Sequence, residues 1–204
     1  MSDWKIFLTY GTLIVVSGYF VAMFIFDLLL RGFAPFLPSR PWVIRQILDE
    51  FKIEKKNAKM VAFSSGRSGV FYALEKKYPD ATFIGIESDF FPYLVAKVQQ
   101  ILRRTKMKVR YEKIRRVDVK DADLVYCHMD PDQLRELGSK FKFECKTGTL
   151  IISTGFNIPY LDPIKIVPLE DRTGKLDFLS RNQNLFQSKY KKYKKEKKAY
   201  FYQI

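Results

Sequence analysis

The chain has 204 residues, 47% of them hydrophobic and 28% charged, so it is long enough to bury a core and its composition excludes a disordered protein. Lys and Arg exceed Asp and Glu by 36 to 22, which gives a formal net charge of +14. That excess predicts attraction to an anionic partner, such as lipid headgroups, nucleic acid or an acidic protein. The two cysteines, Cys127 and Cys145, lie far apart without a Cys/His cluster. They are therefore expected to be buried thiols, not a disulfide or a zinc site.

The first patterned segment, residues 6–30, is almost entirely apolar and carries one charge, Asp27, near its end. A helix needs about 20 apolar residues to cross a bilayer, whereas a signal peptide has a shorter apolar run that ends at a small-residue cleavage site. This segment runs into Arg31 without such a site. We therefore predict an uncleaved, single-pass transmembrane anchor over residues 1–31 and one folded domain over residues 32–204.

Basic residues predict the orientation of this anchor. Lys5 is the one basic residue before the helix, whereas Arg31, Arg40, Arg45 and a lysine-rich domain follow it. Basic flanks favour the cytoplasmic side of a membrane. The domain is therefore expected in the cytoplasm, or in the matrix if the membrane is mitochondrial.

The rest of the chain alternates short apolar runs with stretches of helical spacing. After a proline-rich connector at 32–41, helices are predicted at 42–51, 70–77, 92–103 and 131–143, and strands at 59–63, 81–86, 108–114, 122–127, 148–153, 164–167 and 199–203. This order predicts an α/β fold, with a mostly parallel sheet covered on both faces and a final antiparallel pair at its edge. Ligands bind such sheets beyond the carboxyl ends of the strands, where the strand order reverses.

The loop after the first predicted strand is the first candidate for a ligand site. It reads Ser64-Ser-Gly-Arg-Ser-Gly69, and Glu87 ends the next strand about 20 residues later. Small residues let a ligand approach the backbone, the following helix offers free N–H groups, and the acid can accept hydrogen bonds from both ribose hydroxyls. A serine-rich turn that only connects two elements would look the same. The spacing therefore leaves a nucleoside site and a plain connection open.

Four further segments carry a family resemblance. They are Pro38-Ser-Arg-Pro41, Lys146-Thr-Gly-Thr-Leu-Ile-Ile-Ser153, Phe156-Asn-Ile-Pro159 and the aromatic Tyr200-Phe-Tyr202. In this order, with the apolar helix and the small-residue loop, the chain resembles class I methyltransferases. More narrowly, it is similar to the membrane-anchored protein-lysine methyltransferases of mitochondria, which modify the ATP synthase c subunit and the adenine nucleotide translocase, and to their bacterial relatives. The resemblance implies a Rossmann-like methyltransferase sheet and S-adenosylmethionine as cofactor.

The resemblance also implies six cofactor-binding positions: Ser64, Ser65, Gly66, Gly69, Glu87 and Lys113. The family's loop is usually D-L-G-S-G-D-G, whereas here its opening acid is Ala62 and two of its glycines are Ser64 and Ser68. Lys113 stands near the position of an acid that often contacts adenine. Losing two acids is expected to weaken cofactor binding on the order of 100-fold.

Two catalytic candidates follow from the same resemblance, which places the methyl acceptor near Cys127-His128-Met129-Asp130. His128 is a candidate base or orienting group for an acceptor amine, with a packing or capping role as the alternative. Asp130 precedes Pro131 and is also a good N-cap for the helix that follows.

Three functions remain open from the sequence. The first is a methyltransferase that modifies a lysine of a membrane or membrane-proximal protein, and the second is a non-catalytic binding or scaffold module with the same fold. A nucleotide-binding dehydrogenase ranks last because no G-x-G-x-x-G occurs. The basic, tyrosine-containing run 189–198 is expected to contact anionic lipid, to bind nucleic acid or to form a solvated loop.

Overall fold

The structure is a computed structural model that describes residues 3–26, 41–63, 69–170 and 197–204. The helices are α1 (Asp3–Phe26), α2 (Pro41–Asp49), α3 (Gly69–Lys77), α4 (Phe90–Leu102) and α5 (Pro131–Glu144), with a 3-10 turn, η2 (Ile114–Arg116). The strands are β1 (Lys59–Phe63), β2 (Thr82–Glu87), β3 (Lys108–Tyr111), β4 (Leu124–Cys127), β5 (Leu150–Thr154), β6 (Lys165–Pro168) and β7 (Lys198–Gln203).

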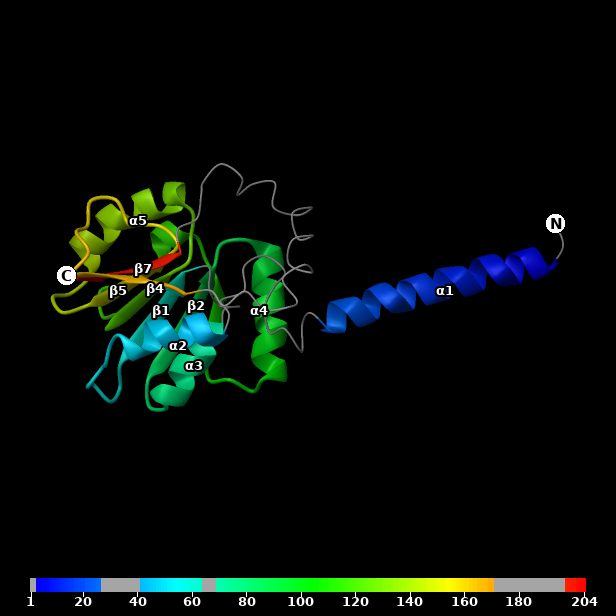
Figure 1. Cartoon of the computed structure of the whole chain (residues 1–204), viewed down its shortest axis with the longest axis horizontal. Helices are drawn as coiled ribbons and strands as arrows, with labels where there is room; N and C mark the ends of the chain where they lie inside the picture. Colours follow the sequence, from blue (N-terminus) through cyan, green and yellow to red (C-terminus); the bar gives the residue numbers. More distant parts are fainter. Residues whose placement is uncertain (1–2, 27–40, 64–68, 171–196) are drawn as a thin grey trace.

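The seven strands form one sheet in the order β3-β2-β1-β4-β5-β7-β6 (Figure 1). The pairs from β3 to β5 are parallel, whereas β7 runs antiparallel to both β5 and β6. The mostly parallel sheet with an antiparallel pair at its edge is therefore confirmed. The strand order reverses between β1 and β4, which is where this architecture places a ligand.

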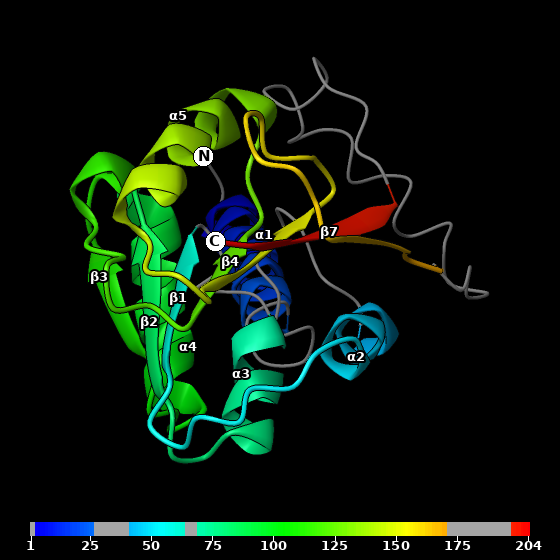
Figure 2. The ribbon, with the colours of Figure 1, turned by 90° about the vertical axis from the view of Figure 1, so that its left-hand side faces the viewer.

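Helices cover both faces of the sheet (Figure 2). On one face, α2, α3 and α4 pack on a buried cluster that includes Met60, Phe83 and Tyr126. On the other, α5 packs on a cluster that includes Phe63 and Val125. Because successive side chains of a strand alternate between faces, a central parallel strand buried on both must be apolar throughout. The four residues from Met60 to Phe63 follow that rule, and Lys59 stands at the partly buried start of the strand.

One predicted strand is too long. The prediction ran through Ile114, but β3 ends at Tyr111 and η2 begins three residues later. There the Arg116 N–H donates to the Lys113 carbonyl at 2.9 Å. Glu112 still donates its N–H to the Glu87 carbonyl of β2, but from Lys113 onward this turn replaces ladder pairing, so residues 113 and 114 do not belong to the sheet.

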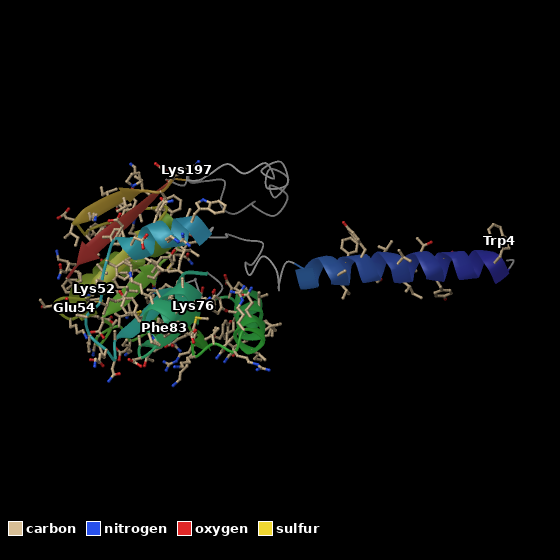
Figure 3. The ribbon with its side chains drawn as sticks, turned by 60° about the horizontal axis from the view of Figure 1, so that its bottom comes forward. Trp4, Lys52, Glu54, Lys76, Phe83 and Lys197 are labelled. Carbon is tan, nitrogen blue, oxygen red and sulfur yellow. The ribbon has the colours of Figure 1, made fainter. Side chains whose placement is uncertain are left out.

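The N-terminal helix α1 extends away from the domain (Figure 1). Its side chains from Thr9 to Ala22 are exposed, and side chains project from opposite sides of the helix (Figure 3). Within the described residues, no helix combines the length and the apolar character needed to cross a membrane. The predicted spanning helix over 6–30 is therefore not found there, and its residues 27–30 lie outside the described part, as does the connector at 32–40.

A half-buried carboxylate, Asp123, joins the segments at the amino ends of the strands. Its Oδ2 accepts from the Lys59 N–H at 2.8 Å, and its Oδ1 accepts from the Lys146 ammonium at 2.6 Å. The Lys55 ammonium lies 3.0 Å from both oxygens. Burial works to raise the pKa of Asp123, but these hydrogen bonds outweigh it and hold that pKa below its usual value. This amino-edge cluster (Lys55, Lys59, Asp123 and Lys146) ties the start of β1 to the loops before it and before β5.

Both cysteines are free and buried, as the sequence predicted. Burial raises the pKa of Cys145 to about 11, so this thiol stays protonated at neutral pH and has little nucleophilic character.

Candidate active site

The carboxyl ends of β2, β4 and β5 bring three polar side chains to one face of the sheet. Phe83 packs on the face covered by α3 and α4, so alternation along β2 places Glu87 on that face too. By the same argument, His128 follows Tyr126 and Thr154 follows Ile152 on this face. Neighbouring strands lie about 4.8 Å apart, so the ends of β2 and β4, two strands apart, are on the order of 10 Å from each other.

Glu87 is the buried acid of this edge, with 2% of its surface exposed. Its backbone carbonyl accepts from the Glu112 N–H at 3.1 Å, which joins the ends of β2 and β3. Placing a carboxylate in a buried position opposes folding unless hydrogen-bond donors reach it. Such acids are more typical of binding sites than of cores. The predicted role of Glu87 as an acceptor for ribose hydroxyls is consistent with this position.

An aromatic cluster lies beside Glu87. Tyr111 is its register partner on β3. The Tyr111 ring centroid lies 5.6 Å from that of Tyr93 and 6.2 Å from that of Phe90, both on α4. The Phe90 and Tyr111 side chains are largely exposed, so part of their ring surface is open to a ligand. Sequence reasoning missed this cluster because it extended β3 past Tyr111 and began the α4 helix after Phe90.

His128 is held by a hydroxyl. Its Nδ1 lies 2.6 Å from Thr154 Oγ1, which also contacts the buried Tyr126 hydroxyl at 3.1 Å. Thr154 Oγ1 donates to the Cys127 carbonyl at 3.5 Å. A hydroxyl has one proton to donate and two lone pairs to accept with. If that proton points to Cys127, then Thr154 accepts from both Tyr126 and His128, and the imidazole carries its proton on Nδ1.

In that arrangement Nε2 is the basic nitrogen of neutral His128, whereas in the other tautomer the Thr154 hydroxyl donates to Nδ1. Thr154 is thus a positioning residue that sequence reasoning missed. The one available signal was that Thr154 ends the strand next to the one that His128 follows.

Asp130 acts as the N-cap of α5. Its Oδ1 accepts from the Gln133 N–H at 2.9 Å, and Pro131 occupies the first turn. This geometry satisfies a backbone donor that would otherwise lack a partner. The capping interpretation is therefore confirmed, and the carboxylate is already engaged by the helix.

The motif Phe156-Asn-Ile-Pro159 follows β5 and anchors its loop. Ile158 is fully buried, and its N–H donates to the Tyr202 hydroxyl at 2.8 Å. Burial raises the pKa of Tyr202 to about 12, although this hydrogen bond works to lower it, so the hydroxyl stays neutral. The motif therefore fixes the backbone at the carboxyl edge.

The remaining predicted cofactor positions divide into two groups. Ser64, Ser65 and Gly66 lie outside the described residues, whereas Gly69 begins α3. Lys113 is exposed at the start of η2, beyond the end of β3. The structure thus brings Tyr111, not Lys113, to the strand end opposite Glu87. Within the described residues, no three His, Cys, Asp or Glu side chains come together as a metal site.

No protein-family model and no curated protein matches this chain. Among solved structures, it is similar to an RNA methyltransferase from Salinibacter ruber in complex with S-adenosyl-L-homocysteine: 15% identity over 82% of this chain and 94% of that chain, with a TM-score of 0.62. It is also similar to the B. subtilis tRNA methyltransferase TrmK: 14% identity over 80% of this chain and 65% of that chain, with a TM-score of 0.53. At these identities the likeness concerns the fold. The chain thus has a Rossmann-like methyltransferase fold.

Proposed function

We propose that the chain is an S-adenosylmethionine-dependent methyltransferase that modifies a lysine of a membrane or membrane-proximal protein. The observation that carries the proposal is the buried carboxylate of Glu87, which lies at the carboxyl end of β2 in a methyltransferase fold. Glu87 lies on β2, which pairs with β1, and the strand order reverses between β1 and β4.

The described residues fit the nucleoside part of this cofactor. The Glu87 carboxylate offers acceptors for two ribose hydroxyls, and the exposed rings of Phe90 and Tyr111 offer surfaces on which an adenine can stack. Stacking supplies affinity without an acid near Lys113, so this site has a substitute for one of the family's missing contacts.

His128 is the proposed base. S-adenosylmethionine, when bound, supplies a methyl group made electrophilic by its sulfonium sulfur. The protein must hold an acceptor amine in line with that group and accept the proton that the amine loses. His128 follows β4 on the same face as Glu87, and its Nδ1 contacts the Thr154 hydroxyl, so we assign the role of proton acceptor to Nε2.

Membrane association is the second part of the proposal. Exposed apolar residues of α1 include the consecutive Leu13, Ile14, Val15 and Val16. Consecutive residues point in different directions around a helix, so this turn of α1 is apolar on all sides, a pattern typical of a covered helix. We propose that lipid covers it, that the domain lies on the cytoplasmic or matrix side, and that the basic run 189–198 contacts anionic lipid.

One observation favours the alternative of a non-catalytic module. Ala62 is fully buried near the end of β1, where the related family has an acid. A binding or scaffold protein could keep the sheet and lose the cofactor.

Calorimetric titration of S-adenosylmethionine and S-adenosylhomocysteine into the full chain in mild detergent tests the proposal. Binding with a Kd in the micromolar range supports it, whereas a folded sample that ignores millimolar ligand supports the non-catalytic module. Radiolabelled methyl transfer to isolated membranes, followed by mass spectrometry, then identifies the acceptor. Label on lysine supports the proposed substrate, and label on RNA contradicts it.

A further inference from the structure

The Tyr126 side chain carries a hydroxyl into the interior of the domain. Tyr126 lies on β4, between β1 and β5, and is 1% exposed within the cluster that α2, α3 and α4 cover. A buried hydroxyl opposes folding unless it makes a hydrogen bond, whereas a phenylalanine would fill almost the same volume without that requirement. The Tyr126 hydroxyl lies 3.1 Å from Thr154 Oγ1, so this residue is a candidate for a role that acts through Thr154.

The Thr154 hydroxyl has three polar neighbours. Its Oγ1 lies 2.6 Å from His128 Nδ1, 3.1 Å from the Tyr126 hydroxyl and 3.5 Å from the Cys127 carbonyl oxygen. A hydroxyl has one proton to donate and two lone pairs with which to accept. Hydrogen bonds between two oxygens are mostly shorter than about 3.0 Å. Tyr126 is therefore the better-placed acceptor for the Thr154 proton whenever Thr154 itself accepts from His128.

Protonation of His128 decides what Thr154 must do. The imidazolium carries a proton on each ring nitrogen, so Nδ1 can only donate and Thr154 Oγ1 must accept. If Thr154 then donates to Tyr126, the oxygen ends of both hydroxyl dipoles lie toward the positive ring, and each hydrogen bond polarises the next. If Thr154 donates to Cys127 instead, Tyr126 turns the positive end of its dipole toward the ring. The charge on His128 therefore favours Tyr126 as the acceptor.

Two carboxylates in the described part of the chain also belong to the edge where His128 lies. Glu87 ends β2 on the same face of the sheet, and Asp130 follows His128 by two residues and accepts from the Gln133 N–H at 2.9 Å. Negative charge at either position favours a protonated imidazole. Removal of the Tyr126 hydroxyl leaves both carboxylates in place. A change in the basicity of His128 on that removal therefore reports the hydroxyl itself.

We infer that Tyr126 is a positioning residue, whose hydroxyl accepts from Thr154 and stabilises the protonated form of His128. This inference rests on the role of His128 proposed above and adds the residue that supports it from the core. In the reaction, a proton moves from the acceptor nitrogen to His128 Nε2, while the N–H bonding pair stays on the acceptor nitrogen. Tyr126 acts on this step through Thr154 and the other ring nitrogen.

Nitrogen NMR of the full chain in mild detergent tests the inference without cofactor or substrate. The chain contains one histidine, so in protein purified without a histidine tag the imidazole nitrogen signals belong to His128. Titration over roughly pH 5–9 gives its proton-binding constant, and the chemical shifts report the tautomer. The variant is Tyr126→Phe. Its matched control is Tyr202→Phe, because Tyr202 is also 1% exposed and its hydroxyl accepts from the Ile158 N–H in the cluster on the opposite face.

In Tyr126→Phe, we expect the proton-binding constant of His128 to fall at least about threefold, with no such change in Tyr202→Phe. An unchanged constant in Tyr126→Phe, or an equal fall in the two variants, would overturn the inference. Thr154→Val removes the hydroxyl through which Tyr126 acts, so the double variant should bind the proton as Thr154→Val does. A further threefold fall in the double variant would show that Tyr126 acts by another route, and would overturn the inference too.

The pH–rate profile separates this inference from the proposed function. A base must be neutral to accept a proton, so the rate of methyl transfer rises as pH passes through the pKa of His128. In Tyr126→Phe this rising limb should move to lower pH together with the NMR titration, whereas Tyr202→Phe should keep the wild-type limb. A chain that transfers no methyl group would defeat the methyltransferase proposal, while the NMR titration would still decide whether Tyr126 stabilises the charge on His128.

Discussion

The amino and carboxyl edges of the same sheet use carboxylates in opposite ways. At the amino edge, Asp123 accepts hydrogen bonds from the backbone of Lys59 and from two lysine side chains, Lys55 and Lys146. At the carboxyl edge, Glu87 is more deeply buried and adjoins exposed aromatic rings. The first acid joins chain segments that are far apart in sequence, and the second lies where this fold binds its ligands.

This comparison assigns fold stability to the amino edge and ligand binding to the carboxyl edge. Substitutions of polar groups at the amino edge should therefore lower the free energy of unfolding without changing ligand affinity. Substitutions of polar groups at the carboxyl edge should do the reverse. Each prediction below tests one side of that division.

Replacing Glu87 should have the largest effect. In Glu87→Gln the charge that would accept two ribose hydroxyls is lost, so the Kd for S-adenosylmethionine should rise on the order of 100-fold. Isothermal titration measures the Kd, and the matched control is Glu54→Gln, an exposed acid in the segment before β1 at the end of the domain away from α1 (Figure 3). An unchanged Kd in Glu87→Gln would show that the Glu87 carboxylate does not bind the cofactor.

Gly138→Ala should disturb the carboxyl edge through packing alone. A Cβ at this position would lie 2.2 Å from the Pro159 carbonyl oxygen, which belongs to the backbone of the loop after β5. Because the backbone must move, we expect a loss of about 2 kcal/mol in the free energy of unfolding. Urea denaturation measures this, with the exposed neighbour Ser139→Ala as control. Equal stability of the two variants would show that this loop is not held against α5.

Asp123→Asn should lower stability but leave cofactor affinity unchanged. The loss of charge-assisted hydrogen bonds at a half-buried acid is expected to cost about 1.5 kcal/mol. Urea denaturation at pH 7 provides the measurement, and the exposed Asp162→Asn is the control. A drop in cofactor affinity with normal stability would contradict the division between the two edges.

The contribution of Asp123 to the free energy of unfolding should also depend on pH. The pKa of Asp123 is lowered in the folded state, so its contribution is fully present above the usual carboxyl pKa of about 4 and is lost as pH falls through the lower folded value. The wild-type protein should therefore lose more stability than Asp123→Asn when the pH falls from 5 towards 2. Parallel curves for the two proteins would show that Asp123 is not linked to folding in this way.

Thr154→Val should have the smallest effect. The valine keeps the shape but removes the oxygen that orients His128. We expect kcat to fall about fivefold with little change in KM, and the pH–rate profile to shift, because the imidazole tautomer is no longer selected. Thr154→Ser should restore both. Failure of the serine variant to restore the profile would indicate that Thr154 acts by packing.

Most of the fold was predictable from hydrophobic periodicity. The strand β1 and the helices α3 and α5 lie within one residue of their predicted bounds, because each is a single apolar run or helical repeat bounded by turns. The end of β3 was predicted wrongly, since alternation in Tyr111–Ile114 resembles a strand although a local turn hydrogen bond forms there. For Asp130, the structure confirms the predicted capping hydrogen bond, and the catalytic role stays a prediction.

The candidate site was only partly predictable. Glu87 could be predicted because an acid about 20 residues after a small-residue loop is typical of a nucleoside site. Thr154 could not, because its contacts with Tyr126 and His128 join residues that are 28 and 26 positions apart in the sequence. The aromatic cluster likewise depends on the register between β2 and β3.

The sequence by itself determined the alternation of strands and helices, the apolar N-terminal segment and the excess of positive charge, because these are properties of neighbouring residues. Only the tertiary structure decided which side of α4 faces outward. It alone showed that Thr154 contacts His128 and that Lys55 and Lys146 bind Asp123. The physical reason is that hydrogen bonds and burial depend on which strands pair and in which register, and these contacts join residues that local pattern leaves independent.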